Sequence, residues 1–206
     1  MGTIKQGVFG ELSGKVGNVV GYKRKGVNRL RIQAASISNP KTPKQQMQRG
    51  KISIAVNFLK TINPYIRIGY KNYAKGNMTY NAAMSYIMRR AIIEEGGTNV
   101  LDFKRIMVSI GFLTTVPDAT ATMEDDVIIF RWADNSGMGN AESTDIAMLL
   151  VYNKERELAI YDTDAATRTD TYAQISLPKE WSSDTMISYL SFRSINGEEV
   201  SNSIRL

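Results

Sequence analysis

The sequence predicts an α+β protein, with a β-hairpin and two amphipathic helices in its first half and a β-sandwich in its second. Apolar residues recur at helical spacing within residues 43–95, whereas after about residue 100 they alternate with polar residues, as in strands. The charge changes at a similar point. Residues 1–110 hold 19 Lys and Arg against 4 acids, and residues 111–206 hold 7 against 16. We therefore expect a basic anchoring domain, 1–99, and an acidic sandwich domain, 100–206.

Residues 16–33 are predicted to form the hairpin. Apolar residues between Val16 and Tyr22 precede a turn at Lys25-Gly26, and apolar residues between Val27 and Ile32 follow it. A glycine-containing turn between two β-branched runs is typical of a hairpin. A two-stranded hairpin is marginal in water, so its edges and faces are expected to need cover.

Two helices are predicted after the hairpin. The first begins at Thr42-Pro43, a good N-cap followed by a good first helical residue, and ends before Asn63-Pro64. The second spans Thr79 to Glu95, where apolar residues recur at helical spacing, and Gly96-Gly97 terminates it.

The second half is predicted to contain seven short strands separated by turn-rich segments. They are placed at 106–113, 127–132, 146–152, 157–161, 171–177, 185–193 and 198–205. Seven short strands in about 100 residues are typical of an immunoglobulin-like or fibronectin-like sandwich.

The composition argues against an enzyme. The chain has no Cys and no His, which excludes thiol catalysis, disulfides, zinc ribbons and Ser-His-Asp triads. The segment Gly10–Val16 looks like a phosphate-binding loop, but three residues separate its glycines and Val16 follows Lys15. That loop needs four residues there, and Ser or Thr after the lysine. We predict no nucleotide, no cofactor and no catalytic residue.

Acidic residues are interpreted as structural. Two acidic pairs fall in predicted turns: Asp125-Asp126, and Asp162 with Asp164. Such residues are usually solvated or cap the turn, and neither pair has a recognisable catalytic spacing. A weak calcium site of Asp134, Asn135 and Asp145 is an alternative because hard oxygen ligands suit that ion. Their spacing matches no known calcium loop, so we predict no metal.

The basic N-terminal region is the sharpest functional signal. Residues 1–75 carry 15 Lys and Arg and a single acid, Glu11. Four tyrosines are interleaved with them: Tyr22, Tyr65, Tyr70 and Tyr73. Such a region fits an acidic protein partner, a nucleic-acid backbone with base stacking, the acidic half of a neighbouring copy, or a merely solvated face. We favour docking on protein because no recognised nucleic-acid motif is present.

The contact site is predicted on the hairpin and the turn after it. Exposed strand edges can add to a neighbour's sheet, and basic side chains would then select an acidic partner. The predicted partner-binding residues are Lys15, Tyr22, Lys23, Arg24, Lys25, Arg29, Arg31, Lys41, Lys44 and Arg49.

Several motifs carry a resemblance to a known family. They are GTIKQG at the start, GKVGNVVG from Gly14, NPKTP from Asn39, WADNSGMGNA from Trp132 and SNS from Ser201. With them the chain resembles an uncharacterised protein family of Bacteroidota and their phages. Residues 14–49 also resemble a segment of phage virion-associated proteins.

The missing catalytic residues, the two-module layout, the opposite charges of the halves and the resemblance together predict a non-enzymatic structural or assembly protein, a phage virion component of the neck, tail or capsid surface. Its partners would be other virion proteins and copies of itself in a homo-oligomer such as a ring, with no membrane involved. It would reside in the virion, and in the host cytoplasm before assembly. The alternative is a sequence-tolerant nucleic-acid-binding protein.

Overall fold

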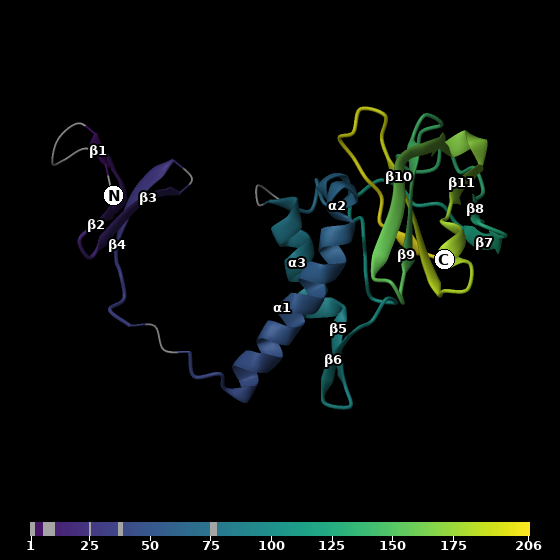
Figure 1. The fold of residues 1–206 in the computed structure, drawn as a ribbon. Coiled ribbons are helices and arrows are strands. Elements are labelled where there is room, and N and C mark those ends of the chain that lie inside the picture. Colours follow the sequence, from purple (N-terminus) through teal and green to yellow (C-terminus); the bar gives the residue numbers. More distant parts are fainter. Residues whose placement is uncertain (1–2, 6–10, 25, 37–38, 75–77) are drawn as a thin grey trace. The chain divides into compact units, whose positions relative to one another are not determined.

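The computed structural model describes residues 3–5, 11–24, 26–36, 39–74 and 78–206 of the chain. The chain divides into two compact units, Met1–Thr42 (unit 1) and Pro43–Leu206 (unit 2) (Figure 1). The predicted boundary at residue 99 falls inside unit 2.

Unit 1 is an antiparallel sheet of strand order β1-β2-β3-β4. Its strands are β1 (Thr3–Lys5), β2 (Glu11–Val16), β3 (Val19–Arg24) and β4 (Val27–Ile32). β3 and β4 pair from Val19 opposite Ile32 to Arg24 opposite Val27. Lys25, in the predicted turn between them, lies outside the described residues.

Three glycines shape this sheet. Gly17 begins the tight turn between β2 and β3 with a φ of 56°, and Gly14 has a φ of 94° within β2. At Gly21 an added Cβ would lie 2.2 Å from the carbonyl oxygen of Leu12, so β2 approaches β3 as only glycine permits. The apolar run from Val16 to Tyr22, predicted as one strand, is divided by the turn at Gly17-Asn18.

The helical part of unit 2 contains α1 (Pro43–Thr61), α2 (Asn63–Gly69) and α3 (Thr79–Arg90). α1 begins at Pro43 as predicted, and Pro64 then lies in the first turn of α2. The second predicted helix ends early: β5 (Ile92–Glu95) pairs with β6 (Thr98–Leu101). Gly96 and Gly97, expected to terminate the helix, instead form the turn of this pair, with φ of 57° and 80°.

The rest of unit 2 forms two antiparallel sheets, ordered β10-β9-β12-β13 and β11-β8-β7. Their strands are β7 (Thr120–Glu124), β8 (Val127–Arg131), β9 (Ile146–Asn153), β10 (Leu158–Thr167), β11 (Tyr172–Ser176), β12 (Met186–Arg193) and β13 (Ile204–Arg205). The strand predicted at 106–113 is absent; within it, Leu113 only bridges Ser201. The strand at β7 was not predicted, since its sequence TATME lacks a run of large apolar residues.

Unit 2 has three layers: the helices, the sheet β10-β9-β12-β13 and the sheet β11-β8-β7. β9 lies in the middle layer and is buried on both faces. Met148, Leu150 and Tyr152 belong to a core shared with the helices, whereas Leu149 and Val151 belong to a core shared with the second sheet. The helices therefore pack on the sheet that the sequence assigned to a separate domain. Within the described residues, no helix is long and apolar enough to span a membrane.

Candidate partner-binding surface

The pairing of unit 1 sorts its side chains onto two faces. In an antiparallel sheet, directly opposed residues lie on the same face and neighbours along a strand alternate. Lys15 is opposite Val20, which is opposite Arg31; Tyr22 is opposite Arg29. The basic face therefore consists of Lys15, Val20, Tyr22, Arg24, Val27, Arg29 and Arg31.

The opposite face, the apolar face, has a different chemistry. Val16 is opposite Val19, which is opposite Ile32, and Leu30 lies across from Gly21. Leu30 is 65% exposed and Ile32 is 79% exposed. Among residues 12–24, 26–36 and 39–42 of unit 1, only Gly21 is buried. This sheet thus presents large aliphatic side chains at its surface instead of enclosing them in a core of its own.

The structure brings together five of the ten predicted contact residues. Lys15, Tyr22, Arg24, Arg29 and Arg31 share the basic face, and all five are exposed.

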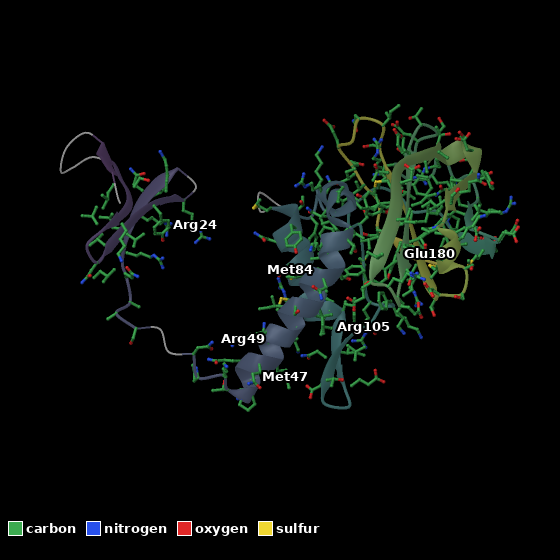
Figure 2. All side chains as sticks on the ribbon, viewed as in Figure 1. Arg24, Met47, Arg49, Met84, Arg105 and Glu180 are labelled. Carbon is green, nitrogen blue, oxygen red and sulfur yellow. The ribbon has the colours of Figure 1, made fainter. Side chains whose placement is uncertain are left out.

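The other five predicted residues are placed differently. Lys23 is opposite Asn28 on the apolar side of the sheet, and Lys25 is outside the described residues. Lys41 is exposed in the segment after β4, with a φ of 49°. Lys44 is exposed on α1, which belongs to unit 2. Arg49, on the same helix, is also exposed (Figure 2).

Sequence reasoning missed the apolar face as a surface in its own right. Its members were assigned to strands, but treating Val16 to Tyr22 as one strand hid the facing pattern. The signal was the Gly17-Asn18 pair, which is typical of a two-residue turn between strands. Placing a turn there sets the register, and the register separates Val16, Val19, Leu30 and Ile32 from the arginines.

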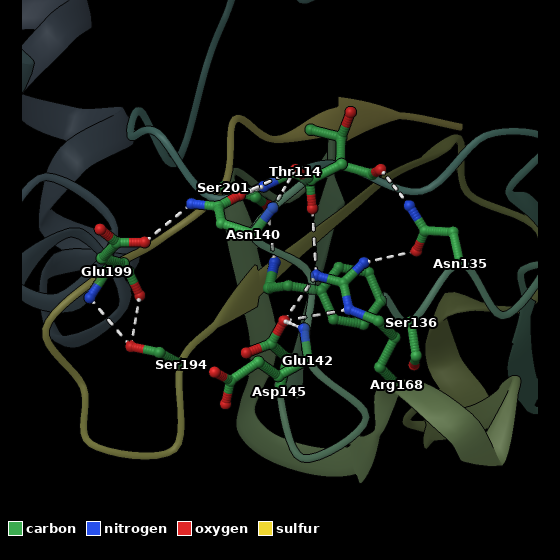
Figure 3. Close-up of polar contacts among 12 residues, drawn as sticks. Thr114, Asn135, Ser136, Asn140, Glu142, Asp145, Arg168, Ser194, Glu199 and Ser201 are labelled. Carbon is green, nitrogen blue, oxygen red and sulfur yellow. Dashed lines mark hydrogen bonds and ion pairs between the residues drawn. The ribbon is translucent and has the colours of Figure 1, made fainter. Parts of the chain in front are cut away.

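Unit 2 contains a buried charged centre formed by Arg168 (Figure 3). Its guanidinium contacts the Oδ2 atom of Asp145 at 3.0 and 3.1 Å and donates to Asn135 Oδ1 at 2.7 Å and to the Thr114 carbonyl at 3.0 Å. It also lies over the ring of Phe192, 4.2 Å from the centroid. Burial lowers the pKa of Arg168 from its usual value, while the adjacent Asp145 favours the charged form.

This centre bears on the calcium alternative. Asn135 and Asp145 do face a common cation, but that cation is the Arg168 guanidinium. Asp134 instead accepts hydrogen bonds from the Ser136 backbone and hydroxyl, which lower its pKa. Among the described residues, no group of three or more His, Cys, Asp or Glu side chains is arranged to hold a metal. The three residues of that alternative thus serve a structural ion pair and a turn.

Comparison with known proteins gives a family and no relative of known activity. No curated protein and no solved structure matched the chain. A family model matched residues 10–206, which covers almost the whole chain and both units. The motifs had pointed to an uncharacterised family. The chain belongs to the family of unknown function DUF6266.

Proposed function

We propose that this protein is a non-enzymatic assembly protein that docks on its partner through unit 1. One observation carries the proposal: the unit 1 sheet has a basic face and an apolar face, and among residues 12–24 and 26–32 only Gly21 is buried. Exposed apolar surface of this kind is typical of a surface that a partner covers.

The apolar face supplies the driving force and the basic face the selectivity. Fully burying a Leu or Ile side chain stabilises by about 1.5–3 kcal/mol, and Leu30 and Ile32 are 65% and 79% exposed. Residues 1–42 carry eight Lys and Arg against one acid, so an acidic partner is favoured and a second copy of the same face is repelled. β4 is also the last strand in the sheet order, and its outer edge offers backbone groups for strand addition.

We assign unit 2 the role of a spacer or contact body with a sandwich of the fibronectin or immunoglobulin type. If β7 to β13 are lettered A to G, one sheet reads A-B-E and the other has C-F-G in order. The remaining strand of that second sheet is β10, and it lies beside C, as C′ does in variable-type domains. In this proposal the N-terminal hairpin of β3 and β4 is the anchoring element.

The proposed setting is a phage particle, as a neck, tail or capsid-surface component. Support comes from the resemblance of residues 14–49 to virion-associated proteins and from the opposite charges of the two chain halves. Opposite charges on one chain suit head-to-tail contacts, which close into rings when the rotation permits.

The test is a triple charge reversal on the basic face, Arg24→Glu with Arg29→Glu and Arg31→Glu. Because these side chains are exposed, the melting temperature should stay nearly constant. Assembly, followed as mass by light scattering and as incorporation into purified particles, should be lost. A matched control reverses three exposed lysines of unit 2, Lys104, Lys154 and Lys179. If the unit 1 variant assembles like the parent, the proposal is wrong.

A second candidate function is sequence-tolerant nucleic-acid binding. It is favoured by the position of Tyr22 on the basic face, directly opposite Arg29 and beside Arg24 and Arg31. Cations that neutralise phosphates, next to an exposed aromatic ring that stacks on bases, suit single strands. Filter binding should then weaken steeply with salt, and Tyr22→Ala should weaken single-strand binding more than duplex binding. Millimolar or weaker binding at low salt would exclude this candidate.

A further inference from the structure

Unit 2 has a pocket with a strongly acidic lining. It measures about 360 Å³ and lies where residues near Leu113, the loop 139–145 and the loop 194–199 meet. Its lining includes four acidic side chains, those of Glu142, Asp145, Glu198 and Glu199, and no Lys or Arg of the described part of the chain. A lining of one charge sign favours a cationic ligand.

One carboxylate oxygen in this pocket is buried without a partner. Asp145 is 1% exposed, and its Oδ2 atom takes the Arg168 contacts and a hydrogen bond from the Glu142 backbone at 2.9 Å. Its Oδ1 atom has no hydrogen-bond partner among the described residues. A buried acceptor that is left unsatisfied destabilises the protein, and more so when it is charged. An N–H donor entering the pocket would remove that destabilisation.

The loops that carry the acids are held in place. Asn140 donates to Glu199 Oε2 at 2.9 Å and takes a hydrogen bond from the Thr114 backbone at 2.8 Å (Figure 3). The loop 194–199 is fastened by Ser194, whose hydroxyl accepts from the Glu199 backbone at 2.9 Å. Lys71 donates to the Gly197 carbonyl at 2.6 Å, which ties the same loop to the segment after α2. The acidic lining is therefore preorganised.

The lining suits a long cationic side chain better than a metal ion. A hard divalent cation needs several oxygens converging on one point, and no such group of acids is present among the described residues. Lys and Arg bring three to five N–H donors on a long stem, which can reach a recessed oxygen and bond the acids around it.

Large apolar side chains lie next to this pocket. Phe112 is 81% exposed and precedes Leu113 of the lining; Met138 is 62% exposed and precedes Gly139. Ile195, in the lining itself, is 62% exposed. Acids beside exposed apolar groups complement the basic face of unit 1, where Arg29 and Arg31 lie beside Tyr22 and Val27.

We propose that the acidic pocket of unit 2 receives an arginine or lysine side chain from the basic face of unit 1 of a second copy of this chain. This inference rests on the proposed function and adds the partner surface. The contact is heterologous, since a different surface of each copy is used, so repetition gives a ring or an open filament.

The experiment is a charge swap in the full-length chain, followed by sedimentation velocity across a concentration series. The first variant is Glu142→Lys with Glu198→Lys, in the pocket; the second is Arg29→Glu with Arg31→Glu, on the basic face. Each should weaken self-association by about 100-fold, because like charges in a contact cost several kcal/mol. An equimolar mixture of the two should associate again in alternation, because the unaltered basic face of the pocket variant meets the unaltered pocket of the basic-face variant, and the reversed charges attract at the next contact. Glu124→Lys, an exposed acid on β7, is the control and should associate like the parent.

The outcomes separate this inference from the proposed function. If the basic-face variant loses association while the pocket variant keeps it, the pocket assignment is wrong and docking through unit 1 stands. If the parent stays monomeric at every concentration, a second copy is not the occupant, and particle incorporation then decides the proposed function. If both variants associate like the parent, both ideas fail.

Discussion

At the scale of single residues, Arg168 shows how unit 2 accommodates a charge in its interior. Its side chain is 0% exposed and reaches Asp145, Asn135 and the Thr114 carbonyl, three groups from distant parts of the chain. Its own carbonyl accepts the Trp132 indole N–H at 2.8 Å. One residue in the segment before β11 thus links the segment before β7 to the connection between β8 and β9.

We predict that Arg168→Ala lowers the free energy of unfolding by about 3–5 kcal/mol, because it leaves Asp145 as an unpaired buried charge. The measurement is chemical denaturation of the two proteins side by side. Arg131→Ala is the comparison: Arg131 is exposed and lies 5.3 Å from the Tyr172 ring centroid, so its loss should cost under about 1 kcal/mol. Equal effects of the two variants would contradict a structural role for the buried pair.

Tyr152 gives a prediction for alkaline pH. Burial raises its pKa from 10.0 to about 12. A raised pKa means that this group stabilises the fold fully below pH 10, and that the contribution is lost as pH rises from 10 to about 12. From pH 10 to about pH 12, the melting temperature of Tyr152→Phe should therefore rise relative to that of the parent. Below pH 10, the difference between the two melting temperatures should stay constant. A constant difference up to pH 12 would show that the folded-state pKa is not raised.

At the scale of elements, the sequence predicted best where apolar residues recur with a regular helical or strand period. β8, β9, β11 and β12 lie within one or two residues of their predicted positions, as does α1. The position of such an element along the chain is set mainly by the spacing of its own apolar residues. β7 is an edge strand with mostly exposed side chains, and it could not be recognised by alternation.

Errors occurred where tertiary context decides. The end of the second predicted helix became β5 because Ile92 and Ile93 favour a strand and Gly96-Gly97 forms a turn there. In the candidate site, the basic residues were identified from composition alone. The facing of each residue depends on the turn at Gly17-Asn18, which was overlooked. The loops that bring Glu142 and Glu199 to one pocket depend on tertiary contacts that no local pattern reveals.

Gly21 tests the architecture of the unit 1 sheet. An added Cβ would lie 2.2 Å from the Leu12 carbonyl oxygen, so Gly21→Ala should force β2 away from β3. We expect amide protection in β2, β3 and β4 to collapse while the melting temperature of unit 2 is unchanged. Gly50→Ala, on α1, meets only the Asn99 side chain at 3.3 Å and should leave unit 1 intact. Retained protection in Gly21→Ala would show that the close approach is not required.

At the scale of the whole molecule, the shared core of unit 2 predicts that helices and sheets unfold together. Phe58 on α1 packs against Tyr152 on β9, with ring centroids 5.1 Å apart. Phe58→Ala should destabilise by about 3–5 kcal/mol. Both tryptophans, Trp132 and Trp181, belong to the core between the two sheets, so their fluorescence reports on the sandwich.

The melting temperature of Phe58→Ala should fall by the same amount whether it is measured from tryptophan fluorescence or from helical ellipticity. Met47→Ala, at a site on α1 that is 40% exposed, serves as the control and should change little. If fluorescence detects no shift while ellipticity does, the helices form a separate folding unit, and the boundary near residue 99 would be the correct one.

The central claim is that the unit 1 sheet becomes covered when the protein assembles. Hydrogen–deuterium exchange of the parent, compared between its assembled and dissociated forms, tests this most directly. Covered strands exchange slowly, so peptides from β3 and β4 should gain protection on assembly, and the β7 peptide should exchange alike in both forms. Assembly that leaves exchange in β3 and β4 unchanged while slowing it elsewhere would contradict the claim that unit 1 makes the contact.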